Sequence, residues 1–135
     1  MIVEITLPAL RAGSVISTII YTQPMTPENV VQRQFEAYNA RDLARFLAQY
    51  SDDIHAYRPP VSEPVIVGKL AFGEFYATQR FNHAGLHAVL VNRILLGNRV
   101  IDHERISGIL DEPFDVAVVY EIANGLIQRT WTFAG

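Results

Sequence analysis

The stretch "VVYEIANGLIQRTWTF", residues 118–133, decides the fold because it holds the clearest turn signal in the chain. Asn124-Gly125 sits between two runs rich in β-branched, aromatic and aliphatic residues. This dipeptide is favoured where both central residues of a two-residue hairpin loop need a positive φ. It therefore predicts an antiparallel hairpin with Ala123 facing Leu126. Counting outward gives the pairs expected on one face: Ile122 with Ile127, Tyr120 with Arg129, Val118 with Trp131 and Val116 with Phe133.

The C-terminal half as a whole predicts a meander of four strands. Its runs are separated only by "GN", "DEP" and "NG", and they span 86–96, 99–110, 114–123 and 126–133. A two-residue turn at 97–98 sets Arg93 opposite Asp102. If the "DEP" loop brings Leu110 opposite Phe114, then Glu104, Tyr120 and Arg129 form a polar row across three strands. A one-residue change in that loop would break the row, because side chains alternate between faces.

Residues 26–81 carry helical patterns. Thr26 and Asp42 are expected N-caps, and Pro27 suits the first helical position. Apolar residues at spacings of three and four predict one helix after Thr26, a second from Asp42 to Tyr50, and a third over 69–81. Short strands are expected around "IHAYR" (54–58) and "VIVG" (65–68), joined by the proline-stiffened loop "PPVSEP" (59–64).

Length and composition predict one domain. The chain has 135 residues, half of them hydrophobic, a net charge of -3 and no cysteine, so disulfides and thiolate metal sites are excluded. No basic block indicates nucleic acid or an anionic membrane, and no apolar run reaches the roughly 18 residues of a membrane span. An acidic residue near the start in place of a lysine argues against a secretion signal, and a cytoplasmic protein is expected. Residues 1–24 are predicted to be an N-terminal extension, a strand or hairpin, before a domain over 25–135.

Several short motifs, in order, resemble one superfamily. They are "VVQR" (30–33), "YNARD" (38–42), "SDD" (51–53), "SEP" (62–64) and "EFYA" (74–77). Together with the order of helices and strands, they resemble the nuclear transport factor 2-like superfamily, in its SnoaL-like and ketosteroid isomerase-like branch, over residues 26–133. The resemblance implies an α+β cone, in which a curved antiparallel sheet wraps three N-terminal helices around a mostly apolar pocket. It also implies a homodimer through the outer face of the sheet.

The residues that the isomerases use are replaced here. Aligning the "VVQR" and "SEP" motifs places the isomerase's catalytic base on Arg58, its oxyanion-binding tyrosine on Gln34 and its buried acid on Val118. Arginine stays protonated and cannot abstract a proton, and valine has no donor. The usual steroid isomerisation therefore does not carry over. Arg58 is instead expected to bind an anionic or carbonyl group at the pocket mouth.

The polar row supplies other candidates for catalysis. Glu104 is the expected base, since burial would raise its pKa, with Tyr120 as hydrogen-bond donor and Arg129 as anion clamp. The alternative is a structural ion pair between Glu104 and Arg129. Further residues expected to line the substrate site are Arg58, Trp131, His87, Tyr38 and Asp102, although Asp102 also suits a half-exposed salt bridge with Arg93.

Metal and nucleotide cofactors are not expected. The four histidines lie on different elements without the spacing of a ligand set, and no dinucleotide or phosphate-binding motif occurs. The leading hypothesis is a pocket for a small apolar or amphipathic molecule, with isomerase, cyclase or dehydratase chemistry. The alternatives are a ligand-binding domain without catalysis and a structural module whose pocket is filled by its own side chains or plugged by the extension.

Overall fold

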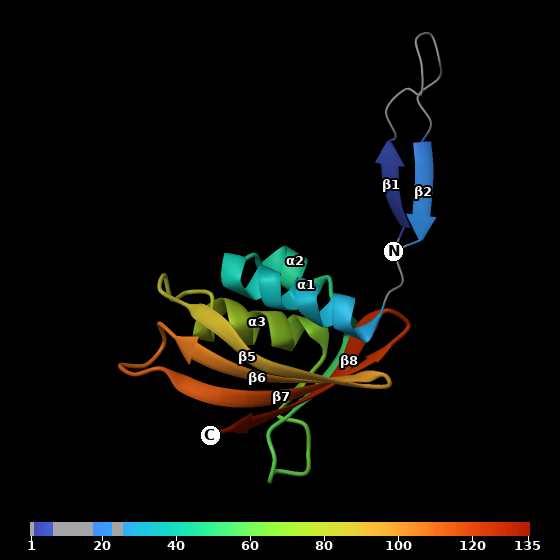
Figure 1. Ribbon diagram of the computed structural model, residues 1–135. Helices are drawn as coiled ribbons and strands as arrows, with labels where there is room; N and C mark the ends of the chain where they lie inside the picture. The colour runs from blue at the N-terminus through green and yellow to red at the C-terminus, as the bar shows by residue number, and fades with distance from the viewer. Residues whose placement is uncertain (1, 7–17, 23–25) are drawn as a thin grey trace.

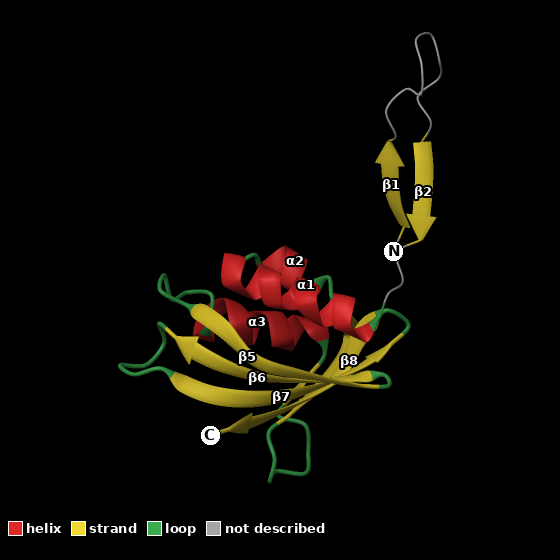
Figure 2. Ribbon diagram, viewed as in Figure 1, coloured by secondary structure: helices red, strands yellow, loops and turns green. Residues whose placement is uncertain are grey.

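The computed structural model describes residues 2–6, 18–22 and 26–135 (Figure 1). Within them, three helices lie together on one side of a curved sheet of long strands (Figure 2). The elements in chain order are β1 (Ile2–Thr6), β2 (Thr18–Thr22), α1 (Pro27–Ala40), α2 (Leu43–Leu47), β3 (Tyr50–Tyr57), β4 (Ile66–Val67), α3 (Lys69–Gln79), β5 (His87–Leu96), β6 (Arg99–Ser107), β7 (Phe114–Ala123) and β8 (Leu126–Ala134).

The main sheet is mixed and has six strands. Its order is β4-β3-β8-β7-β6-β5, and every neighbouring pair is antiparallel except β3 and β8, which run parallel. The predicted α+β class and curved sheet are confirmed, but the expectation of a wholly antiparallel sheet is wrong for this one pair. Since β3 and β8 are joined through α3 and the whole meander, no local turn signal in the sequence fixes their relative direction.

The helix starts follow the predicted caps. The Thr26 hydroxyl accepts a hydrogen bond from the backbone nitrogen of Asn29 at 3.2 Å, and the Asp42 carboxylate accepts one from that of Arg45 at 3.1 Å. Helix α2 ends at Leu47, however, so its predicted extension to Tyr50 is wrong. Tyr50 begins β3 and still packs on the same side as α2, which explains why it matched the helical spacing.

An aromatic cluster occupies part of the space between the helices and the sheet. Phe46 of α2 is at its centre and is only 1% exposed. Its ring centroid lies between 4.7 and 6.1 Å from those of Tyr38, Tyr50, Phe72, Tyr76 and Phe81. Because rings from all three helices and β3 meet here, this cluster fixes the helices against the sheet.

The N-terminal residues form a second, small sheet. Strands β1 and β2 pair antiparallel, from Ile2 opposite Thr22 to Thr6 opposite Thr18. The rest of the predicted extension over 1–24 lies outside the described residues, and the domain boundary at 24–25 stays a prediction. Of the helices in the described ranges, none combines the length and hydropathy of a membrane span.

A β-bulge changes the register of the predicted hairpin. Asn124 and Gly125 have φ values of 54° and 74°, and the predicted pairs Ala123–Leu126 and Ile122–Ile127 are confirmed. Beyond them the register shifts, because Gln128 is an extra residue in β8 and Arg129 pairs with Glu121. One inserted residue turns every later side chain of β8 to the other face. The predicted facing pairs beyond the bulge are therefore wrong: Tyr120 faces Thr130, Val118 faces Thr132 and Val116 faces Ala134.

The pairing of β6 with β7 differs from the prediction, but each side chain of β6 still points to the predicted face of the sheet. Arg93 lies opposite Asp102 as predicted. Toward β7, however, Ile106 faces Phe114, so the connecting loop is longer than expected and Glu104 lies opposite Val116. This shift is by four residues, an even number, so Glu104 and Tyr120 stay on the concave face.

Candidate functional site

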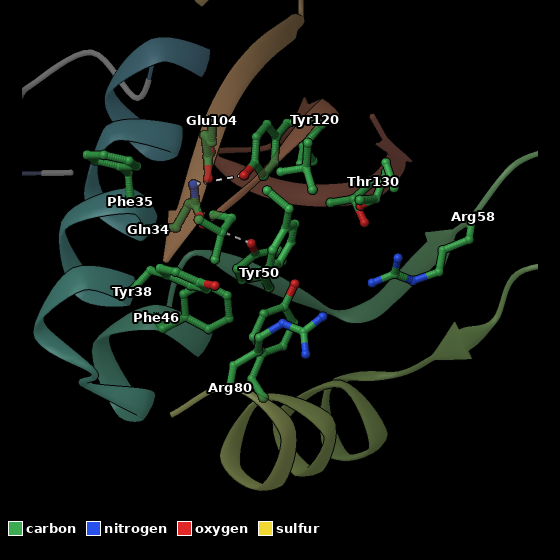
Figure 3. A pocket seen from close by; sticks show the side chains of 17 residues that line it. Gln34, Phe35, Tyr38, Phe46, Tyr50, Arg58, Arg80, Glu104, Tyr120 and Thr130 are labelled. Carbon is green, nitrogen blue, oxygen red and sulfur yellow. Dashed lines mark hydrogen bonds between the residues drawn. The ribbon is translucent and has the colours of Figure 1, made fainter. Parts of the chain in front are cut away.

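A cavity of about 110 Å³ lies between the helices and the concave face of the sheet (Figure 3). Aromatic and aliphatic side chains form much of its wall, and a few polar groups converge on it. The lining residues are Gln34, Phe35, Tyr38, Phe46, Tyr50, Arg58, Tyr76, Arg80, Glu104, Ile106, Phe114, Val116, Val118, Tyr120, Thr130, Thr132 and Ala134.

Glu104 is the carboxylic acid of this cavity. It lies on the inner face of β6 and is 6% exposed. Burial raises its pKa to about 7, and the charge of Asp102 adds to the rise, whereas the charge of Arg93 and a side-chain hydrogen bond with Tyr120 act in the opposite direction. Its Oε2 atom is buried without a hydrogen-bond partner. Near neutral pH, Glu104 can therefore either accept or donate a proton.

A hydrogen-bond chain orients Tyr120 beside Glu104. The Tyr50 hydroxyl donates to Oε1 of Gln34 at 3.1 Å, and Nε2 of Gln34 donates to the Tyr120 oxygen at 3.1 Å (Figure 3). Because the Tyr120 oxygen accepts from Gln34, its own proton is left for Glu104 or a bound molecule. Burial raises the pKa of Tyr50 and Tyr120 well above the usual value, so both remain protonated donors.

Gln34 is a site residue that sequence reasoning missed. In the sequence it stands only where the isomerases have a tyrosine. A detectable signal was present, because Gln34 is a polar residue on the stripe of α1 that buries Val30, Val31 and Ala37. A fully buried amide needs partners for both its oxygen and its nitrogen. That requirement points to other polar side chains inside the fold.

A buried ion pair stands behind Glu104. Asp102 is fully buried, and the Arg93 guanidinium binds it through two hydrogen bonds of 2.7 and 2.9 Å. Arg93 also donates to the Gln32 side chain at 2.8 Å. The pair was expected to be half exposed, but its side chains are 9% and 0% exposed. Asp102 does not line the cavity, and it acts on the site through its charge near Glu104.

The other cavity wall carries two tyrosines and two arginines. Tyr38 lines the cavity as predicted, together with Tyr76, and burial raises the pKa of both hydroxyl groups. Arg58 follows β3 and is exposed at the cavity mouth, the position predicted for it. Arg80, at the end of α3, was not among the predicted residues.

Besides Asp102, three predicted site residues lie outside the cavity. The bulge at Gln128 turns Arg129 and Trp131 to the outer face, so their predicted facing is wrong. Arg129 approaches Glu121 at 3.4 Å instead of Glu104, and Trp131 stacks on Tyr57 with a ring distance of 5.5 Å. His87 is exposed on β5 and does not line the cavity. The structure thus brings together Glu104, Tyr120, Tyr38 and Arg58, and it separates Arg129, Trp131, His87 and Asp102 from them.

No histidine is among the described residues that line the cavity. His103 is on the outer face of the sheet, where its Nε2 is 2.7 Å from the Asp115 carboxylate. Across the part of the chain that the structure describes, no three histidine, aspartate or glutamate side chains come together as a metal-binding group.

Comparisons with known proteins place this geometry in context. The family model described as a SnoaL-like domain matches residues 31–130, and no curated protein matches the sequence. A cystatin-fold protein from Novosphingobium aromaticivorans has a TM-score of 0.72 at 22% identity, covering 79% of this chain and 97% of its own. A candidate ketosteroid isomerase from Kribbella flavida has a TM-score of 0.71 at 19% identity, and the match covers 81% of this chain and 77% of the isomerase. An epoxide hydrolase from M. tuberculosis has a TM-score of 0.68 at 17% identity, and the match covers 81% of this chain and 82% of the hydrolase. At these identities the structural likeness shows the shared fold.

Proposed function

The chain belongs to the SnoaL-like domain family, and from that premise we propose that its cavity binds a small, largely apolar molecule bearing an oxygen function, on which Glu104 moves a proton. The observation that carries this proposal is the buried Oε2 of Glu104, which has no partner and belongs to a group with a pKa of about 7. A buried polar atom without a partner in a cavity is a position that a ligand or water can complete.

The size of the cavity limits the substrate. Its volume of about 110 Å³ is somewhat below that of a protein cavity of about 150 Å³ that holds benzene. A single small ring or a short branched chain therefore suits the inner part of the cavity. The wall beside Glu104 includes Ile106, Val116 and Val118, which favours an apolar body.

The arrangement suits proton abstraction next to a carbonyl group. Ionised Glu104 would take a proton from the carbon beside the carbonyl, and the electron pair of that C–H bond would move into an enolate. The Tyr120 hydroxyl, oriented by Gln34, would donate a hydrogen bond to the developing oxyanion. In a substrate with a β,γ double bond, return of the proton to the γ-carbon gives isomerisation. In a substrate with a β-hydroxyl, the enolate expels that hydroxyl, which leaves as water with the proton held by Glu104, and this gives dehydration. Both outcomes use the same acid–base group.

Hydrogen–deuterium exchange tests the proton transfer without knowledge of the natural substrate. Cyclopentanone in D₂O would be followed by NMR with the wild type and with Glu104→Gln, and Glu121→Gln, on the outer face, is the matched control. We expect exchange catalysed by the wild type to fall by about 100-fold or more in Glu104→Gln, the usual worth of a general base, and to persist in Glu121→Gln.

The outcomes separate the two classes of function. Equal exchange by the wild type and Glu104→Gln would remove Glu104 from the mechanism. If a panel of small ketones binds in the cavity but none exchanges faster than in buffer alone, the domain binds ligands without acid–base catalysis. The second outcome would replace the enzyme proposal with the binding alternative.

A further inference from the structure

Two guanidinium groups lie at the mouth of the cavity. Arg58 follows β3 and Arg80 ends α3, and both line the same space as Glu104. Figure 3 shows Arg58 and Arg80 reaching toward this space from the side away from Glu104. Their charges also act on a common neighbour, since both lower the pKa of Tyr76 against the larger, opposite effect of burial. The two cations therefore share one end of the cavity.

Neither arginine is neutralised by an acidic partner within residues 26–135. Elsewhere in the domain, arginines bind carboxylates through paired hydrogen bonds, as Arg93 and Arg105 do. By contrast, the ion pairs within these residues include neither Arg58 nor Arg80. Arg80 donates to the backbone oxygen of Gln79 at 2.8 Å, and its guanidinium lies 5.1 Å from the centroid of the Phe75 ring. A planar guanidinium held over a ring keeps donors available for a carboxylate.

We propose that Arg58 and Arg80 bind the carboxylate of a small organic acid, whose apolar tail enters the cavity toward Glu104. This inference rests on the proposed ligand-binding function and names the substrate class for it. The apolar wall would hold the tail, and the two cations would hold the anionic end at the mouth. Such an arrangement also orients the ligand, because its carbon skeleton then runs from the arginines toward Glu104 and Tyr120.

The charge pattern favours a monocarboxylate over other small molecules. One anionic end suits the paired cations, whereas a second carboxylate would lie near the buried Glu104, where burial disfavours negative charge. A neutral molecule of the same shape would leave both guanidinium groups without an anionic partner. Benzoate and benzamide form a matched pair of probes, since they share a ring of suitable size and differ in charge.

The test is a binding titration of the whole chain with benzoate, benzamide and inorganic phosphate, followed by the amide NMR signals of cavity residues. We expect benzoate to bind at least about 10-fold more tightly than benzamide, in line with charge-assisted hydrogen bonds. Arg58→Gln and Arg80→Gln should each weaken benzoate by about 10- to 100-fold and leave benzamide unchanged. Arg45→Gln, which alters an exposed arginine of α2, should change neither.

Equal affinities for benzoate and benzamide would overturn the proposal, as would unchanged benzoate binding in the variant with both arginines replaced. Failure of benzoate to bind, or phosphate binding as tightly as benzoate, would also contradict a carboxylate site with an apolar tail. The exchange test uses cyclopentanone, which has no carboxylate to bind Arg58 or Arg80, and it depends on Glu104. The binding test compares benzoate with benzamide and depends on the two arginines, so either test can fail while the other succeeds.

Discussion

Replacing Glu104 by glutamine should make the protein more stable at neutral and alkaline pH. Glutamine keeps the shape of the side chain but cannot ionise, so it removes the cost of placing a charge inside the sheet. In the folded protein the pKa of Glu104 is raised from 4.5 to about 7. At about 1.4 kcal/mol per pH unit, this rise corresponds to about 3 kcal/mol of folding free energy.

The direction of the effect follows from which state holds the proton. Below about pH 4.5 both folded and unfolded chains are protonated at this site. Between about pH 4.5 and 7 the unfolded chain releases a proton that the folded chain retains, so rising pH favours unfolding. Above about pH 7 both states are ionised at this site, and the loss of folding stability is complete. The wild type should thus lose about 3 kcal/mol relative to Glu104→Gln across this range.

Urea unfolding of both proteins at intervals between about pH 5 and 8 measures this difference, because the contributions of all other groups cancel. Glu121→Gln is the control, since that carboxylate pairs with Arg99 and Arg129 on the outer face. The same measurement on Glu121→Gln shows how much of any difference comes from replacing a carboxylate outside the cavity. If the wild type and Glu104→Gln keep a constant difference, within about 0.5 kcal/mol, Glu104 does not titrate as a buried acid and the reasoning fails.

Three further predictions concern stability and assembly. A Cβ at Gly108 would overlap the carbonyl group of Gly85, whereas Gly97, also at positive φ, faces open space. In urea unfolding, Gly108→Ala should lower the free energy of unfolding by more than about 2 kcal/mol, and Gly97→Ala should lower it by about 1 kcal/mol. Arg93→Met leaves the buried carboxylate of Asp102 without its ion-pair partner. It should lower the free energy of unfolding by about 3–5 kcal/mol in the same assay, and a loss below about 1 kcal/mol would contradict the buried pair. We also propose a homodimer through the outer sheet face, where Phe133 is exposed; sedimentation should show a dimer that Phe133→Glu converts to a monomer, and a monomeric wild type would exclude it.

Features set by neighbouring residues were predictable from the sequence. Asn124-Gly125 fixes its own turn, and Thr26 and Asp42 cap the helices they precede. The sequence also predicted that Glu104 and Tyr120 face inward. The predicted pairing of β6 with β7 was wrong by four residues, which is an even number, so both side chains kept their face. Alternation alone preserves the face of a residue under such an error.

The Gln128 bulge could not be predicted from the same pattern. Arg129, Trp131 and Phe133 alternate with threonine and alanine, so a regular hairpin that buries the aromatic rings satisfies the sequence equally well. No glycine or proline marks the extra residue. Only the tertiary structure shows that Trp131 finds an aromatic partner in Tyr57 on the outer face.

Contacts between distant segments were equally inaccessible. The parallel pairing of β3 with β8 depends on how the helices return the chain to the sheet. Gln34 and Arg80 gain their places in the site only because α1 and α3 pack against the same cavity. The apolar stripe of α1 indicates that Gln34 is buried but not which side chains it contacts, so the sequence indicated the acid but missed the group that orients its neighbour.

A carboxyl-carbon NMR titration of the protein with ¹³C-labelled glutamate, assigned through Glu104→Gln, tests the central claim most directly. A Glu104 resonance that titrates near pH 7, and shifts when benzoate enters the cavity, is the predicted result. A resonance that titrates near the ordinary glutamate value of 4.5 and does not shift when ligand is added would show that Glu104 is neither the buried acid nor part of a binding site.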